Sequence, residues 1–331
     1  MEEFVEAIAA EEIPVEVVPA QPEEHPDSQK AKRKRANLKE QLILHSMLLP
    51  GVILVIIFMI VPMIGVVMAF EKFNVVQGFF GSPWVGFKHF HDLFNRPDFW
   101  QATRNTFIIA FWKIVFTSTF SILLALLINE IRLIHIKKTV QTVLFLPYFL
   151  SWALLGNIMV DLFSYSGALN YLLSAFGVEP VYFITSNRWF RVIIVATDVW
   201  KTIGYQIVVF LAAITNIDPA LYEAAKIDGA NHTQLVIHIT LPGIMSMIVL
   251  MSILNIGNIM NAGFDQILVM YNPSVYETGD ILDTMAYRIG LLQVGQYSVG
   301  TAIGLFKSII SATFFSVSYF IAYKVKGYKI F

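Results

Sequence analysis

The sequence predicts an all-α, polytopic membrane protein with six membrane-spanning helices, and its composition is the first reason. Of 331 residues, 56% are hydrophobic and 14% are charged, whereas an average soluble domain has about 25% charged residues. The mean hydropathy is +0.64. The low fraction of charged residues indicates that most of the chain lies in a lipid bilayer. The net charge of −1 argues against a nucleic-acid partner. The absence of cysteine excludes disulfides and thiolate metal sites.

Six apolar runs are the second reason. Each is close to the ~20 residues of helix that cross the hydrocarbon core of a bilayer. Pro50 and Pro62 are expected to bend the first of them, which a membrane helix tolerates when neighbours satisfy the freed carbonyls. The predicted spans lie near residues 46–70, 106–129, 140–163, 190–213, 244–269 and 300–323.

The distribution of Lys and Arg gives the orientation. Residues 1–40 are acidic and then basic, and we predict that they form a disordered cytoplasmic tail ahead of a membrane domain over residues 41–331. With the amino terminus inside, more basic residues fall on the inner side than in the outer loops, as the positive-inside rule requires. Both termini are therefore predicted to be cytoplasmic, and the loop over residues 214–243 lies on the same side.

This inside loop is predicted to fold into two short helices. Asp218 and Pro219 suit the N-cap and first position of a helix. Gly229 suits the left-handed residue that ends it. Asn231 or Thr233 can then cap a second helix, which Leu241-Pro242 should terminate. The result is a compact knob with the form of a docking element, although a plain surface loop at the bilayer interface is the alternative.

The knob also carries a long motif, EAA-x3-G-x9-I-x-LP, which runs without a gap from Glu223 through Gly229 and Ile239 to Leu241-Pro242. This pattern resembles the coupling-loop signature of membrane subunits in bacterial binding-protein-dependent ABC importers. The stretches over residues 86–106 and 187–219 resemble carbohydrate-importing permeases. Residues 263–290 and the segment after them resemble the subgroup for oligosaccharides and polysaccharide fragments, the alginate-oligosaccharide importer permease in particular. The likeness covers nearly all of residues 42–331.

The resemblance implies a type I ABC importer permease fold that pairs with a second, homologous permease as a heterodimer. It implies two cytoplasmic ATP-binding subunits and a periplasmic or extracellular solute-binding protein. ATP and Mg would be bound in the partner subunits, consistent with the lack of a G-x4-G-K-[ST] motif here, so this chain is not expected to be an enzyme. The expected ATPase-docking residues are Glu223, Ala224, Ala225, Asp228, Gly229, Ile239, Leu241 and Pro242.

Polar residues in the fifth predicted span are the candidates for a substrate pathway. Asn255, Asn258, Asn261 and Asp265 recur at helical spacing and are expected to share one face. Amides and a carboxylate suit sugar hydroxyls. Alternatively, these four residues, here called the polar stripe, form hydrogen bonds between helices.

Ionisable residues also occur in other predicted spans. Asp198 and Lys201 are predicted to pair on one helical turn. Lys113 and Lys307 have no evident partner in the sequence. No metal site is predicted, because His89 and His91 lack further ligands at a suitable spacing.

Three other functions stay open at this point. The same architecture could carry a non-sugar solute. A self-contained channel or secondary carrier would show internal inverted repeats, which are not evident. An intramembrane enzyme would need a catalytic constellation within a span, and none is present.

Overall fold

The computed structural model describes residues 41, 44–293 and 295–326, which divide into two compact units, Met1–Ile64 and Gly65–Phe331. Each unit is described by itself. The described residues are mainly helical and form no sheet, with a single isolated bridge between Glu71 and Trp84. The predicted tail over residues 1–40 lies outside the described residues.

The described part of the first unit is helical throughout. Residues 44–55 are α-helical and are followed by the π-helical turn η1 (Ile56–Ile60) and by α3 (Val61–Met63). The Val61 N–H donates to the carbonyl of Ile56, five residues back. Such a π turn directly before Pro62 accommodates a ring that would clash with the carbonyl four residues earlier in a regular α-helix.

Four helical runs are long and apolar enough to cross a membrane by themselves. They are Leu44–Phe70, which ends in η2 (Ile64–Phe70), together with α6 (Pro97–Asn129), α10 (Asn187–Thr215) and α18 (Tyr297–Lys326). Two bent helix pairs raise the number of candidate spans to as many as six. The prediction of an all-α membrane protein with six spans is therefore confirmed. The third and fifth spans are broken helices.

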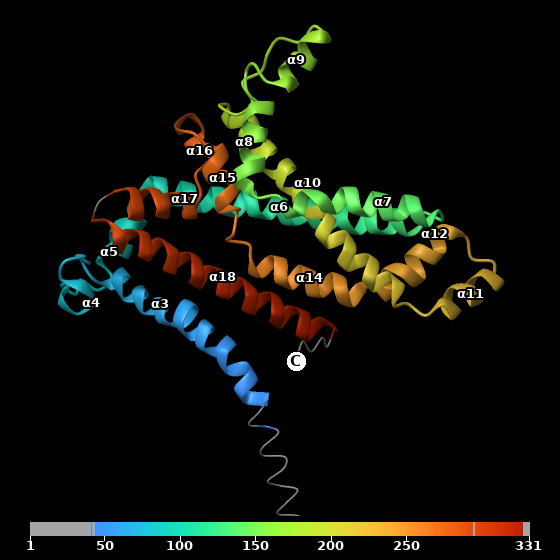
Figure 1. Cartoon of the computed structure of the whole chain (residues 1–331), viewed down its shortest axis with the longest axis horizontal. Coiled ribbons are helices and arrows are strands. Elements are labelled where there is room, and N and C mark those ends of the chain that lie inside the picture. Colours follow the sequence, from blue (N-terminus) through green and yellow to red (C-terminus); the bar gives the residue numbers. More distant parts are fainter. Residues whose placement is uncertain (1–40, 42–43, 294, 327–331) are drawn as a thin grey trace, which may run out of the picture. The chain divides into compact units, whose positions relative to one another are not determined.

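Shorter elements connect these helices, and Figure 1 shows their order. They are α4 (Gly78–Gly81), α5 (Lys88–Phe94), α7 (Ile134–Phe145), η3 (Leu146–Phe149), α8 (Trp152–Leu162), α9 (Ala168–Ala175), α11 (Pro219–Ile227), α12 (His232–Leu235), η4 (Val236–Thr240), α13 (Leu241–Gly243), α14 (Met245–Gly257), α15 (Phe264–Met270), η5 (Pro273–Val275), α16 (Tyr276–Gly279), α17 (Leu282–Tyr287) and η6 (Arg288–Leu292).

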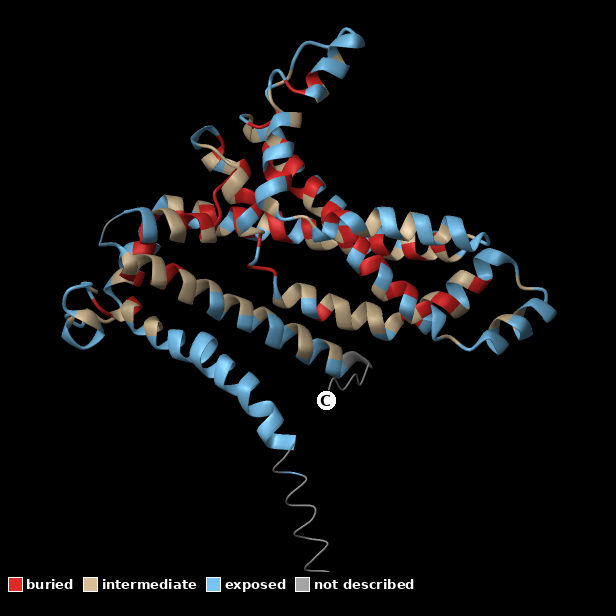
Figure 2. Ribbon diagram, in the orientation of Figure 1, coloured by how far each residue is buried: buried red, intermediate tan, exposed pale blue. Residues whose placement is uncertain are grey.

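The core of the second unit is built on the pair α6 and α10, which pack along much of their length. Figure 2 shows buried residues gathered along α10. Gly204 of α10 lies so close to α7 that an added Cβ would come within 2.1 Å of the carbonyl oxygen of Leu144. Close packing of this kind needs a small residue, as is usual between membrane helices.

The third span breaks between η3 and α8, where the axis turns by 99°. Pro147 lies in η3, and the hydroxyl of Ser151 accepts a hydrogen bond from the N–H of Leu154 to begin α8. The Lys201 ammonium of α10 donates to the freed carbonyl of Tyr148 at 3.0 Å. The expectation of one continuous helix over residues 140–163 is therefore wrong, because the Pro and the Ser cap divide it and a lysine satisfies the exposed backbone.

The fifth span is interrupted twice. The pair His232–Gly243 and Met245–Gly257 is bent by 57°. Beyond Gly257 the chain leaves the helix until Gly263, whose φ of +92° begins α15. The expectation of one helix over residues 244–269 is wrong for this reason.

Candidate functional site

The loop over residues 214–243, the candidate coupling loop, forms the two-helix knob that its sequence predicts. The Asp218 carboxylate accepts a hydrogen bond from the N–H of Ala220 at 2.9 Å, which caps α11. At the other end, Ala230 N–H donates to the carbonyl of Ala225 and Gly229 N–H to that of Lys226. This pair of bonds is a Schellman motif with glycine at the left-handed position, where φ is +82°.

The second helix of the knob begins with a capping box. The Asn231 side chain accepts from the N–H of Gln234 at 2.9 Å, and the Gln234 side chain accepts from the N–H of Asn231 at 2.7 Å. Of the two caps expected here, the structure uses Asn231. The helix does not end at Leu241-Pro242. A π turn, η4, comes directly before Pro242 as one does before Pro62, and the helical run continues to Gly243.

A small groove separates the two helices of the knob. Its volume is about 300 Å³. The hydroxyls of Tyr222 and Thr240 lie 2.9 Å apart and join the two helices beside it. Ile227 is 86% exposed at the tip of α11. The groove is lined by Ala225, Asp228, Gly229, Ala230, Gln234, Leu235, His238 and Ile239.

The structure therefore brings together half of the predicted docking residues. Four of them, Ala225, Asp228, Gly229 and Ile239, line the groove. Glu223, Ala224 and Pro242 are exposed on the knob outside it, and Leu241 is half-buried. The exposed residues present a mixed apolar and charged surface beside the groove.

The knob contacts the rest of the second unit at the C-terminal end of α6. His232 Nε2 lies 3.3 Å from the carboxylate of Glu130, which caps that helix. Figure 1 places α11 and α12 at the end of this unit opposite α4 and α5. The knob thus lies at one end of the second unit and contacts α6 through His232.

The second candidate site is a cavity of about 910 Å³ beside the interruption of the fifth span. It is lined by Met68, Trp152, Asn261, Gly263, Phe264, Asp265, Asp283, Ala286, Tyr287, Gly290, Leu291, Tyr297, Gly300, Thr301 and Lys307. Carboxylates, an amide, hydroxyls and aromatic rings alternate in this lining. Sugar rings can stack on aromatic side chains while their hydroxyls bind the polar groups.

Among the described residues that line this cavity, Lys307 is the one lysine or arginine, and it is paired. Lys307 lies 2.7 Å from both carboxylate oxygens of Asp283. Asp265, which is exposed, adds a second carboxylate to the lining. The sequence identifies Lys307 as an ionisable group within a span, but its partner Asp283 lies in α17 and cannot be identified from spacing along one helix.

The predicted polar stripe is split by the interruption of the fifth span. Asn261 and Asp265 line the cavity, whereas Asn255 and Asn258 do not. Asn255 donates to the hydroxyl of Ser118 at 3.3 Å, which is an interhelical hydrogen bond. Asn258 ends α14 and donates to the carbonyl of Leu254. The expectation of one shared helical face is wrong, because the helix ends at Gly257.

A buried ion pair supports the wall of this cavity. The Lys113 ammonium lies 3.1 Å from the carboxylate of Asp198 and 2.8 Å from the carbonyl of Ala262, in the non-helical segment. It also donates to Gln266, whose amide donates to the carbonyl of Ile194 and to Thr197. The expected pair of Asp198 with Lys201 is wrong, since Lys201 instead donates to the carbonyl of Tyr148.

The loop beyond the cavity carries a second polar cluster. Arg288 Nη2 lies 2.6 Å from Asp280, and its guanidinium lies over the ring of Tyr276 at 4.6 Å. The hydroxyl of Thr284 also donates to Asp280 at 2.7 Å. Burial raises the pKa of the Asp280 carboxyl although Arg288 and Thr284 oppose this shift. The cluster fixes the connection between α16 and α17.

Comparison with known proteins identifies the class of this chain. Residues 117–326 match the model of the family described as the binding-protein-dependent transport system inner membrane component. The chain belongs to this family of ABC transporter permeases and is an inner-membrane protein.

Individual relatives agree with this assignment. The chain is 41% identical over 284 residues to the polygalacturonan/rhamnogalacturonan transport system permease protein YteP of Bacillus subtilis (strain 168), covering 85% of this chain and 88% of YteP. It is 40% identical over 276 residues to the protein LplB of the same organism, covering 83% and 86%.

A solved structure has the same fold. It is a chain of a bacterial ABC transporter involved in the import of the acidic polysaccharide alginate, with a TM-score of 0.81 and 37% identity over 89% of this chain and 99% of that chain. A second structure, of a bacterial alginate ABC transporter in complex with an alginate pentasaccharide-bound periplasmic protein, gives a TM-score of 0.80 with 36% identity, over 88% and 97%.

Proposed function

We propose that this chain is one permease subunit of an ATP-driven importer of oligosaccharides. The observation that carries the proposal is the coupling loop, a preformed and capped knob that projects from the second unit with a groove of its own. YteP is a polygalacturonan/rhamnogalacturonan transport permease, and the similar solved structure belongs to an importer of the acidic polysaccharide alginate, which supports an oligosaccharide as cargo. The ATPase activity would belong to partner subunits, where ATP and Mg bind.

The proposed assembly contains a second, homologous permease, two ATP-binding subunits at the cytoplasmic face and a solute-binding protein on the outside. Both termini of this chain would be cytoplasmic, on the same side as the coupling loop. The groove of the knob would receive part of an ATP-binding subunit, and Glu223, Ala224 and Pro242 would flank that contact. Movement of the ATP-binding subunits would reach the spans through α11, α12 and the Glu130–His232 contact.

Within this proposal the cavity beside the interrupted fifth span is this subunit's part of the sugar pathway. Discontinuous helices in transporters commonly lie at substrate sites, because their free backbone groups are tolerated only beside protein or a wet cavity. Asn261, Asp265, Asp283, Tyr287 and Lys307 supply the polar groups.

An acidic oligosaccharide of the alginate class is the finer proposal, and it is supported by the similar solved structures. In this subunit a sugar carboxylate would have to compete with Asp283 for Lys307, since the two are paired at 2.7 Å. Uptake of labelled oligosaccharide by the reconstituted importer, with acidic and neutral oligosaccharides as competitors, tests both the transport proposal and its substrate class. ATP-dependent uptake of neither kind of sugar would contradict it.

Substitutions in the split polar stripe test the position of the pathway. Asn261→Leu is expected to lower oligosaccharide uptake about tenfold, because it removes a polar group from the cavity and leaves sugar hydroxyls unpaired. Asn258→Leu, three residues away and outside the cavity, is the matched control and should change uptake less than twofold. Equal losses in both variants, measured at equal amounts of assembled importer, would contradict this assignment.

A further inference from the structure

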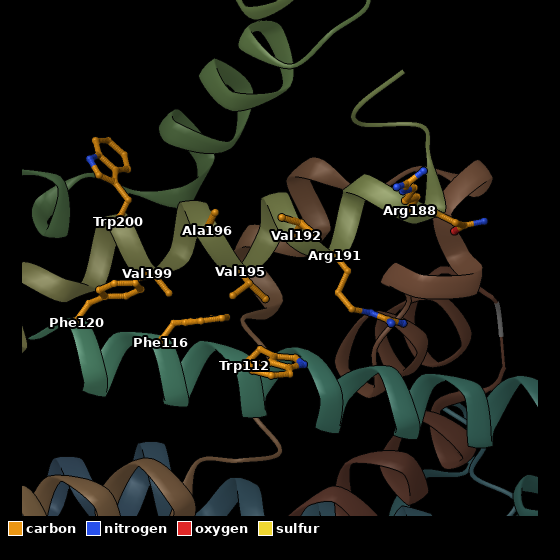
Figure 3. Close-up of a pocket in the computed structure, with 11 residues that line it drawn as sticks. Trp112, Phe116, Phe120, Arg188, Arg191, Val192, Val195, Ala196, Val199 and Trp200 are labelled. Atoms are coloured by element: carbon orange, nitrogen blue, oxygen red, sulfur yellow. The ribbon is translucent and has the colours of Figure 1, made fainter. Parts of the chain in front are cut away.

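A groove between α6 and α10 is separate from the proposed pathway. Its volume is about 720 Å³, and its walls are largely apolar. Figure 3 shows Trp112, Phe116 and Phe120 projecting from α6 toward α10, with two arginines of α10 at one end. The three rings form a stacked ladder, with centroids 5.3 Å and 6.0 Å apart. The α10 wall consists of Arg188, Arg191, Val192, Val195, Ala196, Val199 and Trp200, with Asn187 at the arginine end.

The arginines at this end lack ionic partners among the described residues. Arg188 is exposed, forms no hydrogen bond or ion pair with the described residues, and lies 5.9 Å from the ring centre of Trp189. Arg191 donates to the side chain of Asn105 at 2.9 Å and to the carbonyl of Thr278 at 3.4 Å, and its buried Nε has no hydrogen-bond partner. The nearby Glu277 carboxylate accepts from Asn187 at 3.1 Å and pairs with neither arginine.

The dimensions of the groove match one leaflet of a bilayer. From Arg188 to Trp200 the axis of α10 rises by about 18 Å at ~1.5 Å per residue. Half of the ~30 Å hydrocarbon core is about 15 Å. A charged group at the arginine end would therefore lie near the headgroups while the aromatic ladder lies beside the acyl chains.

We propose that this groove binds an anionic phospholipid, with its phosphate at Arg188 and Arg191 and an acyl chain along Trp112, Phe116 and Phe120. One end of the groove is basic and the rest is apolar, and an anionic phospholipid has a matching phosphate and acyl chain. An apolar helix of a partner subunit would fill the aromatic part but leave two arginines without counter-charge, which is unfavourable at a membrane interface.

The test uses the full importer complex in nanodiscs that contain phosphatidylglycerol and phosphatidylcholine in equal amounts. Lipid that stays bound after extraction is identified by native mass spectrometry. The wild-type complex is expected to retain phosphatidylglycerol preferentially. Arg188→Gln should lower this preference roughly fivefold, the factor expected for one basic residue that faces anionic lipid. Arg188 is chosen because it makes no hydrogen bond or ion pair with the described residues.

Two further variants separate the groove from general effects. Ala196→Trp fills the apolar wall without changing charge and is expected to abolish retention of both lipids. Arg132→Gln removes an exposed arginine outside the groove and should have no effect. Unchanged preference in Arg188→Gln, or an equal loss in Arg132→Gln, would overturn the proposal. Crosslinking of a photoreactive residue at Phe116 to a protein subunit in place of lipid would overturn it as well.

Discussion

Gly229→Val is expected to reduce ATP-driven uptake at least tenfold while leaving the membrane domain folded. Gly229 has a φ of +82° and makes the Schellman turn between the two helices of the coupling loop. A β-branched residue is disfavoured in this left-handed conformation by about 1–2 kcal/mol or more. The turn should therefore rearrange and displace α12 relative to α11, which destroys the groove. Uptake and ATP hydrolysis of the reconstituted importer are measured together.

Gly177→Val is the matched control for this substitution. Gly177 also has a positive φ, of +77°, and an added Cβ meets no atom within 4 Å at either position. The local strain is thus comparable, but Gly177 follows α9 and lies far along the chain from the coupling loop. Uptake should remain near wild type in this control. A similar loss in both variants would show that strain alone, and not the geometry of the knob, reduces transport.

Lys113→Met is expected to destabilise the protein strongly. The Lys113 ammonium is buried and holds Asp198, the carbonyl of Ala262 and Gln266 together at the interruption of the fifth span. Removing one member of a buried ion pair leaves an uncompensated charge and costs about 3–5 kcal/mol. We expect a lower thermal unfolding temperature of the purified complex and reduced amounts in the membrane.

The double variant Lys113→Met with Asp198→Asn separates loss of the pair from loss of packing. It removes the orphan charge and should recover a large part of the lost stability. Lys201→Met serves as the comparison, because Lys201 donates to the carbonyl of Tyr148 and has no carboxylate within 4 Å among the described residues. It should cost less than Lys113→Met. A double variant no more stable than Lys113→Met would show that the charge pair is not the cause.

The coupling loop could be predicted closely because its structure depends on local signals. The Asp218 cap, the Gly229 turn and the Asn231 cap each act within a few residues, and each is present in the structure. The sequence predicts that the second helix ends at Leu241-Pro242, and this prediction is wrong. A π turn accommodates the proline instead, and the helix continues to Gly243, one residue beyond Pro242.

The candidate pathway could be predicted only in part because it depends on contacts between distant segments. Hydropathy alone does not distinguish a continuous span from a broken one, so the sequence predicts one helical face for Asn255 and Asn261, which the structure separates. The two breaks are stabilised by lysines from other helices, Lys113 at Ala262 and Lys201 at Tyr148. The sequence marked both lysines as unusual, but spacing along one helix could not identify partners on another.

Docking of the coupling loop to an ATP-binding subunit is tested most directly by crosslinking through a single introduced cysteine. The chain has no native cysteine, so Ile227→Cys at the exposed tip of α11 provides one unambiguous attachment point. Phe80→Cys is the control, because Phe80 is also fully exposed but lies in α4, at the opposite end of the second unit. The assembled importer should give a crosslink between Ile227→Cys and the ATP-binding subunit, and none from Phe80→Cys. Absence of that crosslink from Ile227→Cys in a complex that transports sugar would contradict the proposed coupling.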